Sequence, residues 1–123
     1  MADKEKIQSY RDLEIWHRTK TYAIHIYKVT KIFPPEEKYG LVSQIRRAAV
    51  SIPLNIAEGF RRGSRKEKVQ FLRHAFGSGA ELETQLEISL GLEYLDQFEY
   101  EKTSKELDEI MRILNTIIRK LSV

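Results

Sequence analysis

The sequence predicts an all-α protein: an up-down-up-down four-helix bundle in one domain, residues 1–123, with about residues 1–10 as a flexible N-terminus. Three observations lead to this prediction. Four segments repeat their apolar residues at helical spacing, and no run alternates apolar and polar residues as a half-buried strand would. Short breaks with proline or glycine separate these segments. The chain has 123 residues, 41% of them hydrophobic and none of them cysteine, so it is long enough for a core without disulfides.

The first helix is expected from Asp12 to Ile32. Asp12 is a suitable N-cap, and Pro34-Pro35 cannot continue a helix. The apolar residues form two stripes, which cover more surface than one bundle core needs. We interpret the second stripe as a contact between subunits and therefore expect a homo-oligomer. The first stripe contains Leu13, Trp16, Ala23 and Tyr27, and the second contains Ile15, Tyr22, Ile26, Val29 and Phe33.

The second helix is expected to begin near Glu36-Glu37, whose charges suit a helix N-terminus. Pro53 lacks a backbone donor and leaves the carbonyl of Ala49 without its usual partner. The apolar stripe continues in register beyond the proline, so we expect the helix to be kinked at Pro53. We expect Asn55 to hydrogen-bond to backbone near the kink or to a neighbouring helix. The stripe contains Leu41, Ile45, Ala48, Ala49, Ile52 and Ile56.

The third helix is expected from about Arg65 to Leu95, with Ser64 as its N-cap and Glu67 in capping-box position. Gly77 and Gly79 lie inside it and cost roughly 1 kcal/mol each against alanine. We therefore expect another backbone to approach closely there. The fourth segment has the clearest stripe, which contains Leu107, Ile110, Met111, Leu114, Ile117, Ile118 and Leu121.

The charges are distributed unevenly, although the net charge is only +3. Residues 46–68 contain seven basic and two acidic side chains, whereas residues 81–101 contain seven acidic side chains and no lysine or arginine. This polarity favours self-association or a polyanionic partner, and two solvated helix faces are the alternative. At the junction of the second and third helices, cations can meet phosphates beside free helix N–H groups. The predicted RNA- or DNA-binding residues are Arg61, Arg62, Arg65, Lys66 and Lys68.

Arg46 and Arg47 have a different expected role. In an antiparallel helix pair that turns near Gly63, they fall level with Glu81 and Glu83. We therefore predict structural salt bridges between helices or between subunits, in preference to a ligand site.

Motifs typical of catalysis are missing from the sequence. There is no Gly-x-Ser-x-Gly elbow and no P-loop, and Glu14–His17 is the one Glu-x-x-His match, where a di-metal bundle needs two. No apolar run has the length of a signal peptide or membrane span. We expect a cytoplasmic protein that is not an enzyme, with no cofactor, metal, membrane contact or small-molecule substrate. A metal-dependent bundle is a minor alternative.

Several stretches over residues 10–121 resemble one family. The most specific run is Arg46-Arg47-Ala48, Ser51-Ile52-Pro53 and Asn55-Ile56-Ala57-Glu58-Gly59. The others are Tyr10-Arg11-Asp12-Leu13 followed by Trp16, Phe33-Pro34, Glu37-x-Tyr39-Gly40-Leu41, Gln44-Ile45 and Gly77-Ser78-x-x-Glu81-Leu82-Glu83. Together they are similar to the four-helix-bundle proteins of 23S ribosomal-RNA intervening sequences. The chain departs from the family pattern at Gly79, where a larger residue is usual, and at Glu93, where glycine is common.

The resemblance implies a bacterial protein that assembles as a homopentameric barrel. Similar proteins include the accessory protein of diversity-generating retroelements, to which binding of nucleic acid and a reverse transcriptase through basic surfaces is ascribed. This chain contains no reverse transcriptase, so that role is not carried over. The expected function is that of a non-catalytic, homo-oligomeric, pentameric bundle that associates with RNA or DNA. The alternative is a protein–protein assembly or adaptor module with no nucleic-acid role.

Overall fold

The computed structural model describes residues 7–123. Within that range the chain contains four α-helices and no strand: α1 (Glu14–Thr30), α2 (Leu41–Phe60), α3 (Arg65–Gly91) and α4 (Gln97–Ser122). Two short 3-10 helices, η2 (Tyr10–Asp12) and η3 (Pro35–Glu37), precede α1 and α2. The predicted all-α class and the number of long helices are confirmed. Of the predicted flexible N-terminus, residues 1–6 lie outside the described residues, and Ser9 is the N-cap of η2.

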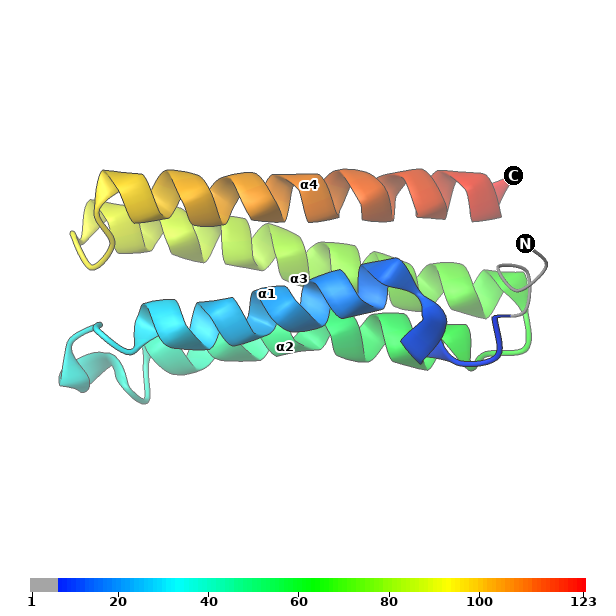
Figure 1. Cartoon of the computed structure of the whole chain (residues 1–123), viewed down its shortest axis with the longest axis horizontal. Coiled ribbons are helices and arrows are strands. Elements are labelled where there is room, and N and C mark those ends of the chain that lie inside the picture. Colours follow the sequence, from blue (N-terminus) through cyan, green and yellow to red (C-terminus); the bar gives the residue numbers. More distant parts are fainter. Residues whose placement is uncertain (1–6) are drawn as a thin grey trace.

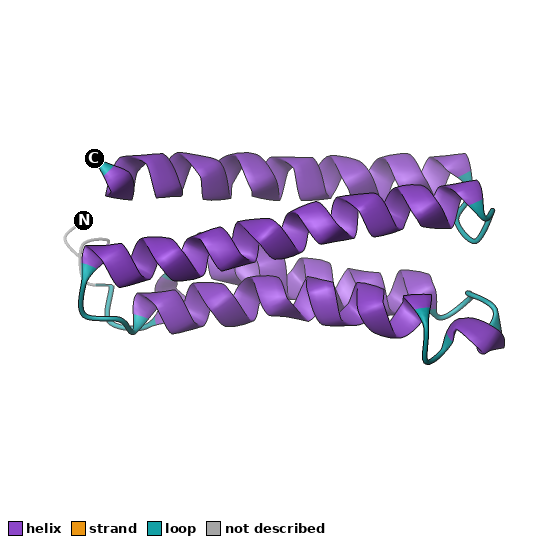
Figure 2. Ribbon diagram, turned by 180° about the vertical axis from the view of Figure 1, so that it is seen from behind, coloured by secondary structure: helices purple, strands orange, loops and turns teal. Residues whose placement is uncertain are grey.

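The four helices lie along one long axis, as Figure 1 shows. The start of α1, the α2–α3 turn and the end of α4 lie at one end of this axis, and the α1–α2 and α3–α4 connections lie at the other. Figure 2, seen from behind, shows loops confined to these two ends. The arrangement therefore gathers segments that are far apart in the sequence at each end of the molecule.

The helix starts agree with the prediction at α3 and differ at α1. Ser64 is the N-cap of α3, and its Oγ accepts the N–H of Glu67 at 3.1 Å, which confirms the predicted cap. Asp12 instead accepts the N–H groups of Gln8 and Ser9 at 3.0 and 3.2 Å and closes the capping box of η2. The N-cap of α1 is Leu13, which has no side-chain cap. Asp12 therefore stabilises the turn before α1 and not α1 itself.

Glu37 lies before α2, within η3, rather than in its first turn. Its Oε1 accepts the N–H of Leu41 at 3.1 Å, so the carboxylate still serves the start of α2. Its other oxygen accepts the hydroxyl hydrogen of Tyr94 at 2.9 Å, and this hydrogen bond raises the pKa of Tyr94. Glu37 thereby joins the α1–α2 connection to the α3–α4 connection.

The core extends along the length of the bundle and changes the interpretation of α1. Ile15, Tyr22, Ile26 and Val29 are 8, 2, 0 and 9% exposed within the single chain. These residues pack against buried side chains of α2, α3 and α4, so they need no second subunit to cover them. The other stripe is the more exposed one, because Trp16 is half-buried and Tyr27 is 42% exposed. The interpretation of the Ile15–Val29 stripe as a subunit contact is therefore wrong.

Pro53 lies inside α2, which continues as a helix on both sides of it. Asn55 Nδ2 donates to the carbonyl and to the hydroxyl oxygen of Ser51, at 2.9 and 3.0 Å. The Ser51 hydroxyl in turn shares a 2.8 Å hydrogen bond with Ser78 of α3. Asn55 is thus linked to backbone one turn earlier and, through Ser51, to the neighbouring helix. The kink itself stays a prediction.

Gly77 and Gly79 have different surroundings. A Cβ at Gly79 would overlap Sδ of Met111 in α4, whereas a Cβ at Gly77 would meet nothing within 4 Å. Gly79 is buried and Gly77 is exposed. The group that approaches closely is therefore the side chain of Met111 and not a backbone, and it approaches Gly79 but not Gly77.

Candidate nucleic-acid interface

The predicted binding turn joins α2 to α3 with few residues. Arg61 is the C-cap of α2, and Ser64 is the N-cap of α3. Gly59 is buried in the last turn of α2, where a Cβ would lie 3.1 Å from Cβ of Phe71 and 3.4 Å from the carbonyl oxygen of Lys68. Glycine at this position therefore lets α2 and α3 come together immediately before the chain reverses.

Two of the five predicted binding residues hold the turn itself. Arg62 forms an ion pair with Glu58 at 2.5 Å, and its guanidinium lies 4.6 Å from the ring centroid of Phe71. Lys68 Nζ donates to the carbonyl of Phe60 at 2.9 Å, near the C-terminus of α2. Both side chains are half-buried. Their first role is to close the turn, so a phosphate would have to compete with these partners.

The other three predicted residues, Arg61, Arg65 and Lys66, are exposed. None of them forms a salt bridge among residues 7–123. Arg65 Nη1 donates to the carbonyl of Val123 at 3.1 Å, which places the end of α4 beside the start of α3. The guanidinium of Arg61 lies 5.5 Å from the ring centroid of Tyr10. These three cations are the members of the predicted set that are most available to an anionic partner.

The structure adds cations that the sequence analysis missed. Arg119 and Lys120 lie in the last turn of α4, at the same end of the bundle as the turn. Arg11 lies 4.9 Å from the ring centroid of Tyr10, the ring that Arg61 also approaches. We call the following exposed set the basic end: Arg11, Arg61, Arg65, Lys66, Arg119 and Lys120. In an up-down-up-down bundle of four helices, both chain ends and the turn between the second and third helices lie at the same end, so the expected topology already predicts this grouping.

The predicted salt bridges of Arg46 and Arg47 with Glu81 and Glu83 are not present between residues of the described chain. Arg46 turns to α1 instead: its Nε donates to Thr30 Oγ1 at 2.9 Å and its Nη2 to the Tyr27 carbonyl at 3.1 Å. This arginine therefore joins α1 to α2.

Arg47 and Glu81 line the same groove between α2 and α3, as expected of residues at the same height along an antiparallel helix pair. Glu83 has acidic neighbours: burial raises the pKa of its carboxyl group, and the charges of Asp108 and Glu87 raise it further. Salt bridges between subunits stay a prediction.

Among residues 7–123, the ion pairs between different helices join α1 to α4, the first and last helices of the chain. Arg18 Nε donates to Glu106 at 2.9 Å, and Arg18 also pairs with Glu109. These hydrogen bonds raise the pKa of Arg18. His25 lies 3.2 Å from Glu99 in the same helix pair. Sequence reasoning missed these contacts because it had no register for α1 against α4.

Among the described residues there is neither a cluster of potential metal ligands nor a helix that could span a membrane. Over residues 7–123, no group of three or more His, Asp or Glu side chains could hold a metal ion. His17 of the Glu14–His17 match donates from Nε2 to the carbonyl of Arg11 at 2.6 Å. In this same range, no helix is long and apolar enough to cross a membrane.

Comparison with known proteins identifies a family and solved structures that are similar to this chain. Residues 11–116 match the family described as 23S rRNA-intervening sequence protein. A crystal structure of a protein of unknown function from the S23 ribosomal protein family of Bacteroides thetaiotaomicron is similar, with 25% identity and a TM-score of 0.79. The similarity covers 85% of this chain and 95% of that one. None of the curated proteins compared with the chain matches it.

Proposed function

Because the chain belongs to the family of 23S rRNA-intervening sequence proteins, we propose that it is a non-catalytic, homo-oligomeric bundle that associates with RNA or DNA through its basic end. The resemblance implies that the oligomer is a pentamer. The proposal includes one domain over residues 1–123, an up-down-up-down helix order with a kink at Pro53, and a cytoplasmic location. The position of the loops at two ends of the axis supports this order.

One observation carries the binding proposal: Arg61, Arg65 and Lys66 are exposed at the α2–α3 turn. Arg11, which precedes α1, and Arg119 and Lys120, in the last turn of α4, enlarge this basic surface. A polyanion that replaces its counterions with these side chains gains entropy from ion release. The positive N-terminal ends of the α1 and α3 dipoles favour a phosphate, but the negative C-terminal ends of α2 and α4 lie at the same end of the bundle and oppose them. Side-chain charge, more than helix dipoles, is therefore expected to supply the affinity.

The proposal is tested with a charge-reversal variant, Arg61→Glu, Arg65→Glu and Lys66→Glu. These residues are exposed, so we expect helicity and oligomer mass to be retained. Binding of fluorescent single-stranded RNA and DNA is measured by polarisation over a range of salt concentrations. The log-log slope of the wild type should be about −0.7 per phosphate contacted, and losing three contacts should reduce its magnitude by about 2.

A matched control reverses three exposed lysines outside the basic end: Lys28, Lys102 and Lys105. It changes the net charge by the same amount, so it separates a local contact from the general field of the protein. The control variant should keep the wild-type slope. An equal loss of binding in both variants, or no binding by the wild type at about 50 mM salt, would refute the basic end as a nucleic-acid site.

The alternative function is a protein–protein assembly or adaptor module. Exposed apolar residues on α1 and α2 favour it, since Ile24 is 50% and Leu54 is 62% exposed. Large exposed apolar residues that lie together mark interaction sites more often than single ones do. If nucleic acid does not bind, this reading replaces the first.

A further inference from the structure

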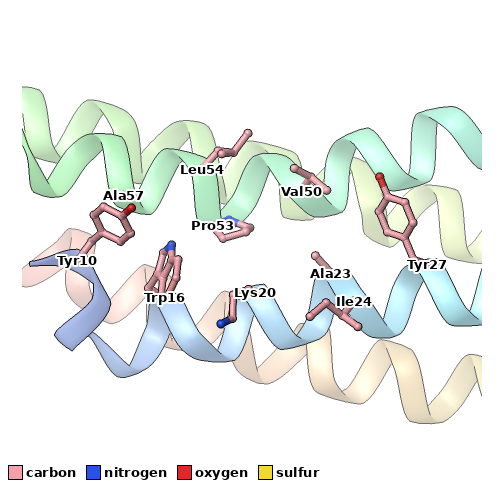
Figure 3. Close-up of a pocket in the computed structure, with 10 residues that line it drawn as sticks. All are labelled: Tyr10, Trp16, Lys20, Ala23, Ile24, Tyr27, Val50, Pro53, Leu54 and Ala57. Atoms are coloured by element: carbon pink, nitrogen blue, oxygen red, sulfur yellow. The ribbon is translucent and has the colours of Figure 1, made fainter.

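An apolar groove runs between α1 and α2, with a volume of about 440 Å³. Figure 3 shows Trp16 and Tyr27 of α1 extending toward α2, whose Pro53 ring lies on the side of α1. Ile24 of α1 and Leu54 of α2 also line the groove. Its lining contains one charged residue, Lys20, and no acidic residue. Because Pro53 has no backbone N–H, its ring presents an apolar surface at this position of α2. We call this surface the α1–α2 groove.

Two cations at the edge of the groove lie over aromatic rings that line it. Lys20 Nζ lies 5.0 Å from the ring centroid of Trp16, and the Arg46 guanidinium lies 4.5 Å from that of Tyr27. Such contacts hold long side chains in place over apolar surface while their charge stays available to a partner. The partner that fits this groove is therefore apolar at its centre and acidic around it.

The end of α3 and the start of α4 have these properties. Ile88, Leu92 and Phe98 are 47, 50 and 74% exposed. Ile88 and Leu92 are four residues apart at the end of α3 and share a face. All charged side chains from residue 81 to residue 101 are acidic, and Glu93 lies between Leu92 and Phe98 in the chain. We call Ile88, Leu92, Glu93 and Phe98 the acidic corner.

The acidic corner is held in a defined shape by its backbone. The N–H of Leu92 donates to the Ile88 carbonyl at 2.9 Å, and the N–H of Tyr94 donates to the Ser89 carbonyl at 2.9 Å. The Tyr94 ring is anchored on Phe33, with ring centroids 5.3 Å apart. The corner is therefore ordered before it meets a partner, and ordering it costs little on binding.

We propose that the α1–α2 groove of one copy receives the acidic corner of a second copy. The inference rests on the homo-oligomer of the proposed function and names the surfaces that build it. Apolar residues meet apolar residues, and Lys20 and Arg46 meet the acidic side chains of the α3–α4 connection. The two surfaces lie on different parts of the chain, so the contact is heterologous: the copy that supplies the groove keeps its corner free, and the copy that supplies the corner keeps its groove free, so that further copies can add. Such a contact closes into a ring when the rotation between copies permits it.

The test uses two variants that each lose one of the two surfaces. Ile24→Glu with Leu54→Glu blocks the groove, and Leu92→Glu with Phe98→Glu blocks the corner. All four residues are exposed, so circular dichroism should show unchanged helicity. Each variant alone should have the mass of one chain by light scattering. An equimolar mixture should give a species of twice that mass, because the intact corner of the first variant meets the intact groove of the second.

The outcomes separate this inference from the proposed function. A wild-type monomer would overturn the oligomer and the interface together, while leaving the nucleic-acid experiment to decide the basic end. A wild-type oligomer whose blocked variants keep the wild-type mass would overturn the interface alone. Two monomeric variants that fail to combine would also overturn the interface, because an intact groove and an intact corner would then be present and would not bind each other.

A cross-linking measurement checks the contact inside the full oligomer. The chain has no cysteine, so a Leu54→Cys, Phe98→Cys variant carries thiols at the two proposed surfaces and nowhere else. Mild oxidation should join copies into a ladder on a denaturing gel. The matched control, Leu54→Cys with Arg112→Cys, places the second thiol on an exposed residue of α4 away from the corner and should give no ladder beyond background. Equal ladders in both variants would overturn the assigned contact.

Discussion

Gly77 and Gly79 should respond to the same substitution with opposite signs. Both lie inside α3, where alanine is favoured over glycine by about 0.8–1.0 kcal/mol. At Gly77 the added methyl group meets nothing within 4 Å, so Gly77→Ala should stabilise the protein by close to this amount. At Gly79 the methyl group overlaps Sδ of Met111, and overpacking of this kind costs about 1–3 kcal/mol.

The two variants should therefore differ by about 1–3 kcal/mol in the free energy of unfolding. For a chain of this length, 1 kcal/mol corresponds to about 4 °C in unfolding temperature. Thermal unfolding followed by circular dichroism should place Gly77→Ala about 3–4 °C above the wild type and Gly79→Ala at or below it. Light scattering at the same concentration should show unchanged mass, so that assembly does not contribute to the difference.

Met111→Ala supplies the second half of a double-mutant cycle. Alone it should cost about 2–5 kcal/mol, because it leaves a cavity in the core. In that background Gly79→Ala should become stabilising, since the overlapping side chain is gone and the helix propensity remains. If Gly79→Ala stabilises the wild type as much as Gly77→Ala does, then Met111 does not restrict this position and the reasoning fails.

Three further results are expected. Glu93→Gly should raise the unfolding temperature by about 2–4 °C. A side chain at the φ of 64° found for Glu93 costs roughly 1–2 kcal/mol, and the greater freedom of glycine in the unfolded chain offsets about half of the gain from removing it. An unchanged unfolding temperature would argue against backbone strain at Glu93. Asn55→Ala should cost about 0.5–1.5 kcal/mol in denaturant unfolding through loss of its hydrogen bonds to Ser51, and no loss would mean that these bonds only replace water. Burial raises the pKa of Tyr22, whose hydroxyl donates to the Thr103 carbonyl at 2.8 Å. The folded-state pKa lies above the unfolded value, so this contribution is complete below about pH 10 and is lost as the pH rises further. An absorbance titration should show one tyrosine that ionises only on unfolding, and Tyr22→Phe should remove that step; a wild-type titration with all tyrosines ionising together would contradict it.

Periodicity was sufficient for the helices and for most of the core. Ile45, Ile52 and Leu107 lie on the predicted apolar stripes and are fully buried, because apolar residues that repeat at helical spacing face the other helices. Local chemistry alone predicts Ser64 as the N-cap of α3. Such features depend on neighbours in the chain, so they can be predicted without knowing the packing.

Which of two apolar stripes on one helix is buried can be decided only from the three-dimensional packing of the helices. Ile15 and Trp16 are adjacent and both apolar, and only the position of α4 and α2 decides which of them is buried. The same holds for Arg61 and Arg62, which the sequence does not distinguish: Arg62 pairs with Glu58 one turn earlier and stacks on Phe71, while Arg61 lies near Tyr10 and is exposed. A cluster of like residues in the sequence therefore predicts a charged region and does not say which of its members a ligand can use.

The close approach of α2 and α3 at Gly59 also determines how a polyanion would be bound. The turn after it is braced by Lys68 on the Phe60 carbonyl and by the Ser64 cap, so its backbone is already ordered. A bound phosphate would restrict the long side chains of the turn, at up to roughly 1.5–2 kcal/mol each, but would order no peptide units. Lengthening this turn with a few glycine and serine residues would keep every cation and loosen their spacing. Affinity should then fall at every salt concentration while the salt slope stays the same, which is the signature of lost preorganisation rather than of lost charge.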